Sequence, residues 1–292
     1  MQPRFPRIFA GRAGFLTLAL VYASLVIGCL AAFVAAGDLS LGRRPLQNLV
    51  RTAGEFAYPS FLDVWFGNPR LEYRSDDGTV LRVENRRVVE SGYLKGLARA
   101  TWTTFSIATL GSLLGAALAL PLGICSARNL KAPRFLRLPA KGVLDTARAV
   151  HTLVFGLVLV GIVGLGPTAG ILAIGFHSMG TYGKLFAESI ESLDMGAIEA
   201  VRSVGATPAQ VFFNAVWPAA LPQFVSIHLY IWEFNIRDST ILGIIGAGGL
   251  GLLITEATSL FQWGRLSTVL IVIVILVSSF DALSSRIRKA LT

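Results

Sequence analysis

The chain has 292 residues, of which 53% are hydrophobic and only 15% charged, and its formal net charge is +9. Because the apolar residues are gathered in long runs, this composition predicts a membrane protein. The basic residues lie at the ends of those runs, which is a signal of membrane topology. They form no basic face with interleaved aromatic residues, so we expect no nucleic-acid partner.

The sequence also argues against a disulfide, a metal pair and ATP binding by this chain. Cys29 and Cys125 both lie inside apolar runs, where isolated thiols behave as small core residues. The phosphate-binding loop Gly-x-x-x-x-Gly-Lys-Ser/Thr is not present. We therefore expect no cofactor and no metal on this chain.

Residues 1–36 begin with a basic stretch and continue as an apolar run. Arg4, Arg7 and Arg12 occur without any acid, and residues 13–36 are uncharged. That run exceeds the roughly 7–15 residues of a signal-peptide core. The positive flank places the N-terminus in the cytoplasm, so we predict a first transmembrane helix here.

Residues 37–98 differ in kind, because charges are frequent and apolar runs are short. The stretch Tyr73–Val83 predicts a β-hairpin, with Asp77-Gly78 supplying the turn. We place this segment on the extracytoplasmic side. Both a cap over an entrance and a passive linker fit its composition.

Residues 99–292 contain the remaining apolar runs, which predict spans over 101–127, 143–165, 168–186, a segment from about 221, and 267–283. Between the first two of these, residues 128–141 hold five cations and no acid, the strongest cytoplasmic mark in the chain. Arg286, Arg288 and Lys289 place the C-terminus inside. We therefore predict an all-α polytopic membrane protein with six transmembrane helices.

Residues 188–218 are a polar stretch between apolar ones, here called the elbow. Its acidic helical start is expected to break at Gly205, where a turn is least costly. Thr207-Pro208 then combine a helix N-cap with proline at the first helical position. A helix–glycine–helix elbow at a membrane surface has a shape suited to docking, although an ordinary cytoplasmic loop is the alternative.

The fifth predicted span contains charges that are costly at membrane depth. Glu233, Asn235, Arg237 and Asp238 are followed by the glycine-rich residues 243–251. Glu233 and Arg237 are four residues apart, so they could simply form an ion pair on a helix. In the functional interpretation Arg237 meets an anion. The glycines either let backbone N–H groups approach that anion or break the helix for a gate.

The histidines and serines do not form a catalytic pattern. His151, His177 and His228 lack the spacing of a metalloprotease, and packing roles are expected for them. Ser178 lacks the Gly-x-Ser-x-Gly context of a nucleophile elbow. We therefore expect no enzyme activity on this chain.

The elbow resembles the Glu-Ala-Ala coupling motif of ABC-importer permeases. Four positions match it: Glu199, Ala200, Gly205 and Pro218. Three depart from it: Val201, Ala215 and Trp217. The resemblance implies that this stretch contacts a separate ATPase subunit. The coupling residues would then be Glu199, Ala200, Gly205, Ala206, Thr207, Pro208, Phe212 and Pro218.

A narrower resemblance is to phosphonate-transport permeases, from about residue 99 to the end. Glu-x-Asn-Ile-Arg at residues 233–237 is its specific part, while Gly-Ala-Gly-Gly-Leu-Gly at 246–251 also resembles methionine-type permeases. His151 departs from the pattern, because proline, and a kink with it, is expected there. The substrate path or gate would involve Arg237, Glu233, Asn235, His177, Gly246, Gly248, Gly249 and Gly251.

These resemblances imply a type I ABC-importer permease in the cell (inner) membrane that imports phosphonate, phosphate or phosphite. Its implied partners are a second copy of itself, an ATPase dimer carrying ATP and Mg, and an extracytoplasmic solute-binding protein. One alternative is a permease of the same architecture for another solute, such as an amino acid. The other is an ATP-independent secondary transporter, which should show internal repeats with matched broken helices.

Overall fold

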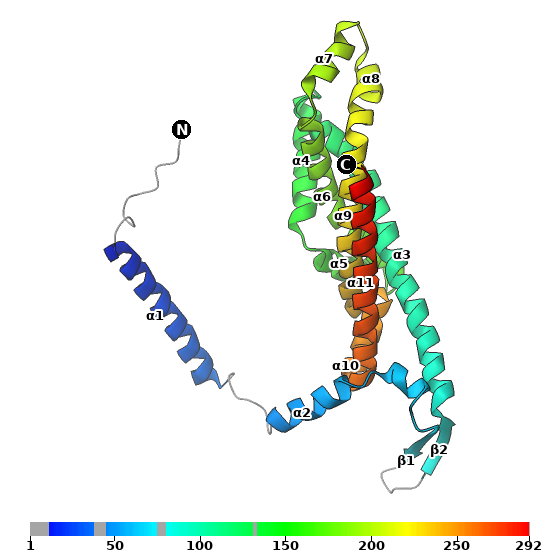
Figure 1. The fold of residues 1–292 in the computed structure, drawn as a ribbon. Coiled ribbons are helices and arrows are strands. Elements are labelled where there is room, and N and C mark those ends of the chain that lie inside the picture. Colours follow the sequence, from blue (N-terminus) through cyan, green and yellow to red (C-terminus); the bar gives the residue numbers. More distant parts are fainter. Residues whose placement is uncertain (1–11, 38–44, 75–79, 131–132, 292) are drawn as a thin grey trace. The chain divides into compact units, whose positions relative to one another are not determined.

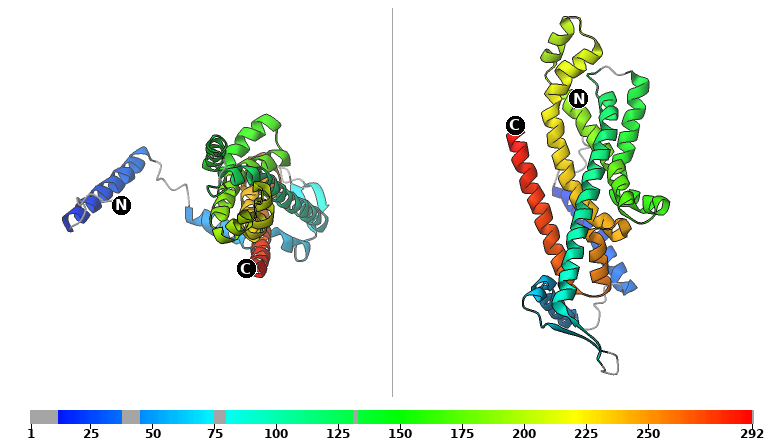
Figure 2. Two further views of the ribbon diagram at one scale, coloured as in Figure 1. Left: turned by 90° about the horizontal axis from the view of Figure 1, so that it is seen from above. Right: turned by 90° about the vertical axis from the view of Figure 1, so that its right-hand side faces the viewer.

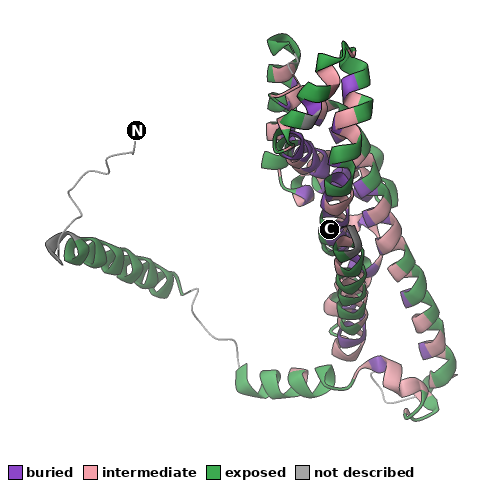
Figure 3. Cartoon of the chain, turned by 45° about the horizontal axis from the view of Figure 1, so that its top comes forward, coloured by how far each residue is buried: buried purple, intermediate pink, exposed green. Residues whose placement is uncertain are grey.

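The computed structural model describes residues 12–37, 45–74, 80–130 and 133–291. Contacts divide the chain into two units, residues 1–53 and residues 54–292, and each is described by itself. The first unit contains helix α1 (Arg12–Ala36) and most of helix α2 (Pro45–Phe56). The side chains described on α1 are exposed throughout (Figure 3). An apolar helix of 25 residues with no buried side is suited to lipid contact.

The second unit begins with a small polar region outside the helical bundle. A short helical turn, η2 (Ser60–Val64), precedes strands β1 (Arg70–Arg74) and β2 (Val80–Asn85). The strands pair antiparallel, with Arg70 opposite Asn85. The predicted turn at Asp77-Gly78 lies outside the described residues. At the end of β2, the Asn85 side chain accepts a hydrogen bond from the Arg87 backbone N–H at 3.0 Å and so caps the next helix.

That next helix, α3 (Arg86–Ser126), has 41 residues and is much longer than the predicted span of 101–127. The expected boundary near residue 98 is therefore wrong as a structural break. Its polar outer part is held by tertiary contacts. Glu90 accepts a hydrogen bond from Arg265 at 3.3 Å, and the Arg265 guanidinium lies 4.7 Å from the centre of the Tyr93 ring.

Helices α3, α6 (Pro167–Glu191) and α9 (Trp217–Leu242) lie side by side at the centre of the second unit (Figures 1 and 2). Glycines bring α3 close to α6. A Cβ atom at Gly115 would lie 3.0 Å from the carbonyl oxygen of Gly175, and one at Gly123 would lie 2.9 Å from that of Gly183. Small residues allow such close approach in membranes, where apolar burial gives no separate driving force between helices.

The predicted third span, 143–165, is wrong as a single helix. The structure has α4 (Arg134–Ala149) and α5 (Thr152–Val163), bent by 93°. Val150 and His151 are extended, and the His151 side chain accepts a hydrogen bond from the Leu153 N–H at 3.2 Å. The bend therefore exists without the proline of the family pattern, because histidine caps the second helix.

Beyond α6, the elbow contains α7 (Met195–Ser203), α8 (Pro208–Val211) and a π-helical turn, η3 (Phe212–Val216), which runs directly into α9. The predicted start of the fifth span near residue 221 is therefore too late. Pro222 lies inside α9 and does not end it. The chain then forms a second π-helical turn, η4 (Gly243–Ala247), followed by α10 (Leu250–Ser259) and α11 (Trp263–Leu291).

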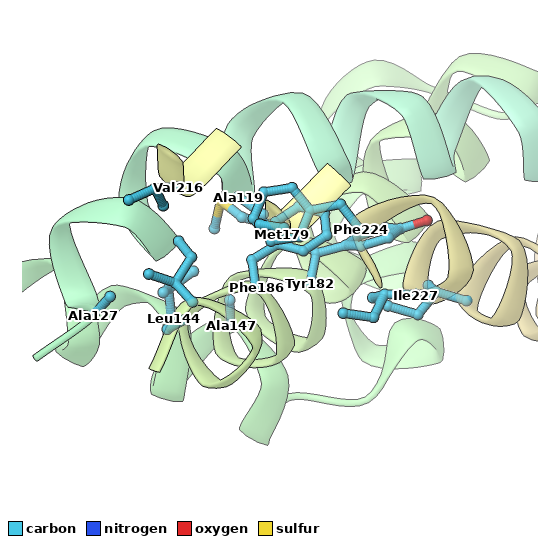
Figure 4. Packing of buried hydrophobic residues seen from close by; sticks show 14 of the residues in the cluster. Ala119, Ala127, Leu144, Ala147, Met179, Tyr182, Phe186, Val216, Phe224 and Ile227 are labelled. Atoms are coloured by element: carbon cyan, nitrogen blue, oxygen red, sulfur yellow. The ribbon is translucent and has the colours of Figure 1, made fainter. Parts of the chain in front are cut away.

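The largest apolar core lies between α3, α4, α6 and α9. Figure 4 shows its centre, where Tyr182 and Phe186 of α6 pack against Phe224 of α9. The ring centres of Phe186 and Phe224 are 4.5 Å apart. Leu144 of α4 belongs to the same cluster, so the core joins all four helices.

Within the described residues, three helices are long and apolar enough to cross a membrane: Phe15–Ala36, Arg86–Ser126 and Trp263–Lys289. The number rises to five if α4 with α5, and α8–η4 with α10, each count as one bent span. The predicted six would additionally require α6, whose 25 residues include many small and polar ones. The all-α membrane architecture is confirmed, whereas the exact count of six is not.

We expect Gly180→Ala to destabilise the contact between α4 and α6. The added Cβ would lie 2.4 Å from the backbone nitrogen of Arg148 and 2.6 Å from the carbonyl oxygen of Leu144. Overpacking against backbone typically costs about 1–3 kcal/mol. Thermal unfolding of the purified chain in detergent measures the effect. Gly142→Ala, where nothing lies within 4 Å of the new Cβ, is the matched control. Equal melting temperatures for Gly180→Ala and the parent would contradict the packing.

Candidate functional site

The elbow is built by local hydrogen bonds that its sequence predicts. Asp194 caps α7 by accepting the Gly196 N–H at 2.9 Å. Gly205 has φ +82°, which favours glycine, although its Cβ position is open space. Thr207 and Gln210 form a reciprocal capping box, in which Gln210 accepts the Thr207 N–H at 2.8 Å. The predicted break and restart are confirmed.

One side of the elbow is fastened to the bundle. Ile198, Val211 and Val216 are buried in the main core. The residues that follow α3 are attached to the end of α6 by two hydrogen bonds. Asn129 donates to the Ile190 carbonyl at 2.6 Å, and the Arg128 N–H donates to Glu191 at 2.9 Å. The elbow is therefore a supported projection at one end of the bundle (Figure 1).

The opposite side of the elbow is exposed. Most predicted coupling residues lie there: Glu199, Ala200, Gly205, Thr207, Pro208 and Pro218. Ala206 and Phe212 are half-buried. Two large apolar side chains that the motif comparison missed are among the most exposed, Val204 at 81% and Phe213 at 66%. Val204 directly precedes the turn at Gly205, and that position is a signal that could have indicated it as a docking residue. Phe213 lies further along, in η3.

The second region is the polar block on α9, formed by Glu233, Asn235, Arg237 and Asp238. Glu233 is buried, and its two carboxylate oxygens are used separately. One pairs with Arg237, four residues on. The other accepts a hydrogen bond from Ser284 at 3.2 Å and lies 3.9 Å from Arg288. The predicted pair of Glu233 with Arg237 therefore exists, and it also joins α9 to α11.

Asn235 and Asp238 connect α9 to three other helices. The Asn235 amide donates to Ser112 of α3 at 2.8 Å and accepts from Ser178 of α6 at 3.1 Å. Asp238, which the sequence marks as a costly charge without giving it a role, accepts from Thr152 of α5 at 2.7 Å. Both residues are buried. Asn235 thus lies between helices in this structure.

Arg237 is the exception within the polar block. Its side chain is 52% exposed, whereas that of Glu233 is 10% exposed. Its guanidinium contacts Glu233 through one nitrogen, Nη2. Since arginine has five donors, the contact with Glu233 leaves donors available for an anion.

His177 supports the bend between α4 and α5. Its Nδ1 lies 2.8 Å from the Val150 carbonyl oxygen, at the residue where α4 ends. The rings of His177 and His151 are 6.2 Å apart. No group of three His, Cys, Asp or Glu residues suited to a metal occurs in the part of the chain that the structure describes.

The glycines after α9 permit a sharp break in the helix, at which the chain bends by 58° before α10. Gly246, Gly248 and Gly249 all have positive φ. A Cβ at Gly251 would lie 2.0 Å from the Thr240 carbonyl oxygen, and one at Gly249 would lie 2.4 Å from the Thr104 hydroxyl. The same hydroxyl accepts the Leu250 N–H at 2.8 Å. These contacts use the glycines for packing and for breaking the helix.

Comparison with known families identifies the fold. Residues 119–292, which include the elbow and the polar block, match the family described as the inner membrane component of binding-protein-dependent transport systems. The chain belongs to this family. The permease resemblance seen in the sequence is thereby confirmed.

Relatives narrow the group further. A phosphite transport system permease protein of Stutzerimonas stutzeri is 37% identical over 199 residues, which cover 68% of this chain and 72% of the relative. A phosphate-import permease protein of Mycolicibacterium smegmatis is 39% identical over 195 residues, covering 67% of this chain and 37% of that protein. Among solved structures, an inward-facing MetNI methionine ABC transporter chain matches with a TM-score of 0.61 at 25% identity. That match covers 67% of this chain and 96% of the other.

Removing Glu233 should destabilise this permease more than removing Arg237. Glu233→Ala takes a buried acceptor from Ser284 and Arg237, and lost hydrogen bonds to a charged group cost about 1.5–3 kcal/mol. Arg237→Ala should change the melting temperature little, because its side chain is half exposed. Glu188→Ala, which breaks an exposed pair with Lys184, is the control. An Arg237→Ala effect as large as that of Glu233→Ala would show that the arginine is mainly structural.

Proposed function

We propose that this chain is the membrane-spanning subunit of an ATP-driven importer for phosphonate, phosphate or phosphite oxyanions. The observation that carries the proposal is the supported elbow, whose exposed face includes most positions of the coupling motif. Relatives whose names specify phosphite and phosphate transport support the substrate class. The chain itself acts in transport and is not an enzyme.

The partners follow from the shape of the elbow and from the family. The name of the family specifies a binding-protein-dependent system, which supports an extracytoplasmic binding protein as the source of solute. A partner ATPase dimer would contact the exposed side of the elbow, including Val204 and Phe213, and would carry ATP and Mg. A second copy of this chain would complete the path.

The mechanism uses the direct connection between the elbow and the substrate path. Because η3 passes into α9 without a break, a force on the elbow acts on one continuous helix of 26 residues, about 39 Å at 1.5 Å per residue. That helix carries Arg237 and ends at the glycine-rich bend of residues 243–251. Movement of the elbow would therefore shift the anion-binding arginine and the gate together. The importer would alternate between an inward-open and an outward-open state. Arg237 needs different affinities for the anion in these two states, because a ligand shifts an equilibrium only by its difference in affinity.

The proposed topology places the elbow, the N-terminus and the C-terminus in the cytoplasm of a cell with this chain in its inner membrane. The cations of residues 128–141 and of the last turn of α11 support this orientation. The small polar region with β1 and β2 is then extracytoplasmic.

Uptake into vesicles tests the function. Vesicles holding this chain with its ATPase and binding protein should accumulate labelled phosphate when ATP is supplied, and methylphosphonate should compete. Arg237→Ala should assemble normally and lose most of the uptake, whereas Arg134→Ala, at an exposed cation outside the polar block, should not. ATP-dependent assembly without oxyanion uptake would move the substrate to another solute, such as an amino acid. Uptake by this chain alone would overturn the ATPase-coupled proposal in favour of a secondary transporter.

Coupling should depend on the backbone conformation of Gly205. A β-branched residue is strained at its φ of +82°, so Gly205→Val should lower substrate-stimulated ATP hydrolysis by about tenfold, the effect of some 1–2 kcal/mol of local strain. Gly205→Asn should retain most of the activity, because asparagine tolerates this conformation. Unchanged ATP hydrolysis in the valine variant would refute the role of the turn.

A further inference from the structure

We propose that a cleft between α4 and α6, closed by the end of α3, is a binding site for a phosphate-type anionic group. The cleft encloses about 490 Å³. It is separate from the polar block, because none of the α9 residues contributes to its lining. The proposal therefore goes beyond the transport function and uses only its assignment of the elbow end to the cytoplasm.

Beside the cleft, α4 and α6 approach each other closely. Gly180 and Gly183 of α6 allow this approach, since Cβ atoms there would collide with the backbone and side chain of Leu144. Ala140, Leu144 and Ala147 of α4 are buried. The cleft beside this contact is lined by Arg137, Lys141 and Arg148 of α4 and by Lys184 and Glu188 of α6. Figures 1 and 2 show the course of the two helices.

Five cations line the cleft: Arg128, Arg137, Lys141, Arg148 and Lys184. Three acids share it, and each has a cation partner. Asp145 pairs with Arg148 at 3.0 Å, Glu188 with Lys184 at 3.5 Å, and Glu191 with Arg128 at 4.0 Å. Among the described residues, Arg137 and Lys141 have no acidic partner. They lie one helical turn apart, so two positive charges are available on one side of the cleft.

This charge arrangement suits a phosphate-type group. Arginine matches two oxygens of such a group with its fork of donors, and lysine adds a compact charge beside it. The lining has five cations against three acids, so a cationic ligand would meet net repulsion. Basic pockets between membrane helices on the cytoplasmic side are known to hold lipid head groups.

Two sources can supply the same chemistry. One is the head group of an anionic phospholipid, whose acyl chains would contact the exposed apolar residues Phe135, Leu138 and Val143 of α4. The other is a free phosphate-type anion in the cytoplasm. Both would be held by Arg137 and Lys141, and both would stabilise the packing of α4 beside the end of α6, where the elbow begins.

The test uses the full chain with two probes. In nanodiscs of neutral phosphatidylcholine, equilibrium dialysis measures binding of labelled inorganic phosphate. In vesicles of phosphatidylcholine with phosphatidylglycerol, spin-labelled phosphatidylglycerol measures head-group retention against spin-labelled phosphatidylcholine. We expect binding of at least one probe, weakened about fivefold for each cation removed, in Lys141→Gln and in Arg137→Gln/Lys141→Gln. The exchange variant Arg137→Lys/Lys141→Arg keeps both positive charges, so it should bind the probe as the parent does. A folding defect caused by substitution at these positions would abolish binding here too.

The control is Arg286→Gln/Lys289→Gln, which removes two cations from the end of α11 outside the cleft. It should bind both probes as the parent does. If the glutamine variants lose only phosphate binding, the ligand is a free anion. If they lose only phosphatidylglycerol retention, the ligand is a lipid. The proposal is overturned if the parent binds neither probe, or if the glutamine variants bind as the parent does. Transport failure in the uptake assay leaves these binding results unaffected, so the two proposals fail separately.

Discussion

Polar groups inside an apolar bundle must find partners, and in this permease that constraint falls mainly on α9. Glu233, Asn235 and Asp238 are buried, and each bonds to a different set of neighbours. Together they reach α3, α5, α6 and α11. Within the membrane an unpaired polar group costs several kcal/mol. The block therefore fixes how α9 sits among the other helices, which apolar packing against lipid-like surroundings would specify poorly.

The same helix connects the two candidate functional regions. The elbow enters α9 through a π-helical turn, and α9 ends at the glycine-rich bend near Thr104. Because α9 is hydrogen-bonded to four neighbouring helices, it cannot move alone. A displacement of the elbow would therefore move these helices together with α9. Arg237 is the one member of the polar block with a half-exposed side chain, and this distinguishes it from residues that only hold helices together.

At the opposite end, hydrogen bonds and ion pairs join the polar region before α3 to the bundle. Arg86 contacts Asp63 of η2 at 3.4 Å, and Ser60 of η2 forms a buried hydrogen bond with Thr268 of α11 at 3.1 Å. Glu90 of α3 contacts Arg265 of α11 at 3.3 Å. These contacts extend α3 well beyond its apolar part and hold it against the start of α11. An entrance cap or a linker would both need this attachment, so the attachment explains the length of α3 without assigning the role of residues 37–98.

Local signals determined much of this protein. Apolar runs predicted the membrane class, and Gly205 with Thr207-Pro208 predicted the elbow, because positive φ and helix caps depend on neighbours in the chain. The motif around Glu233 and Arg237 indicated the permease family. The tertiary structure alone decided the length of α3, the role of Asp238 and the α4–α6 cleft. Each of these depends on residues distant in sequence, such as Thr152 and Asp238, whose meeting no local pattern encodes. The bend at His151 has both kinds of cause, because His151 caps α5 locally while His177 contacts the Val150 carbonyl from α6.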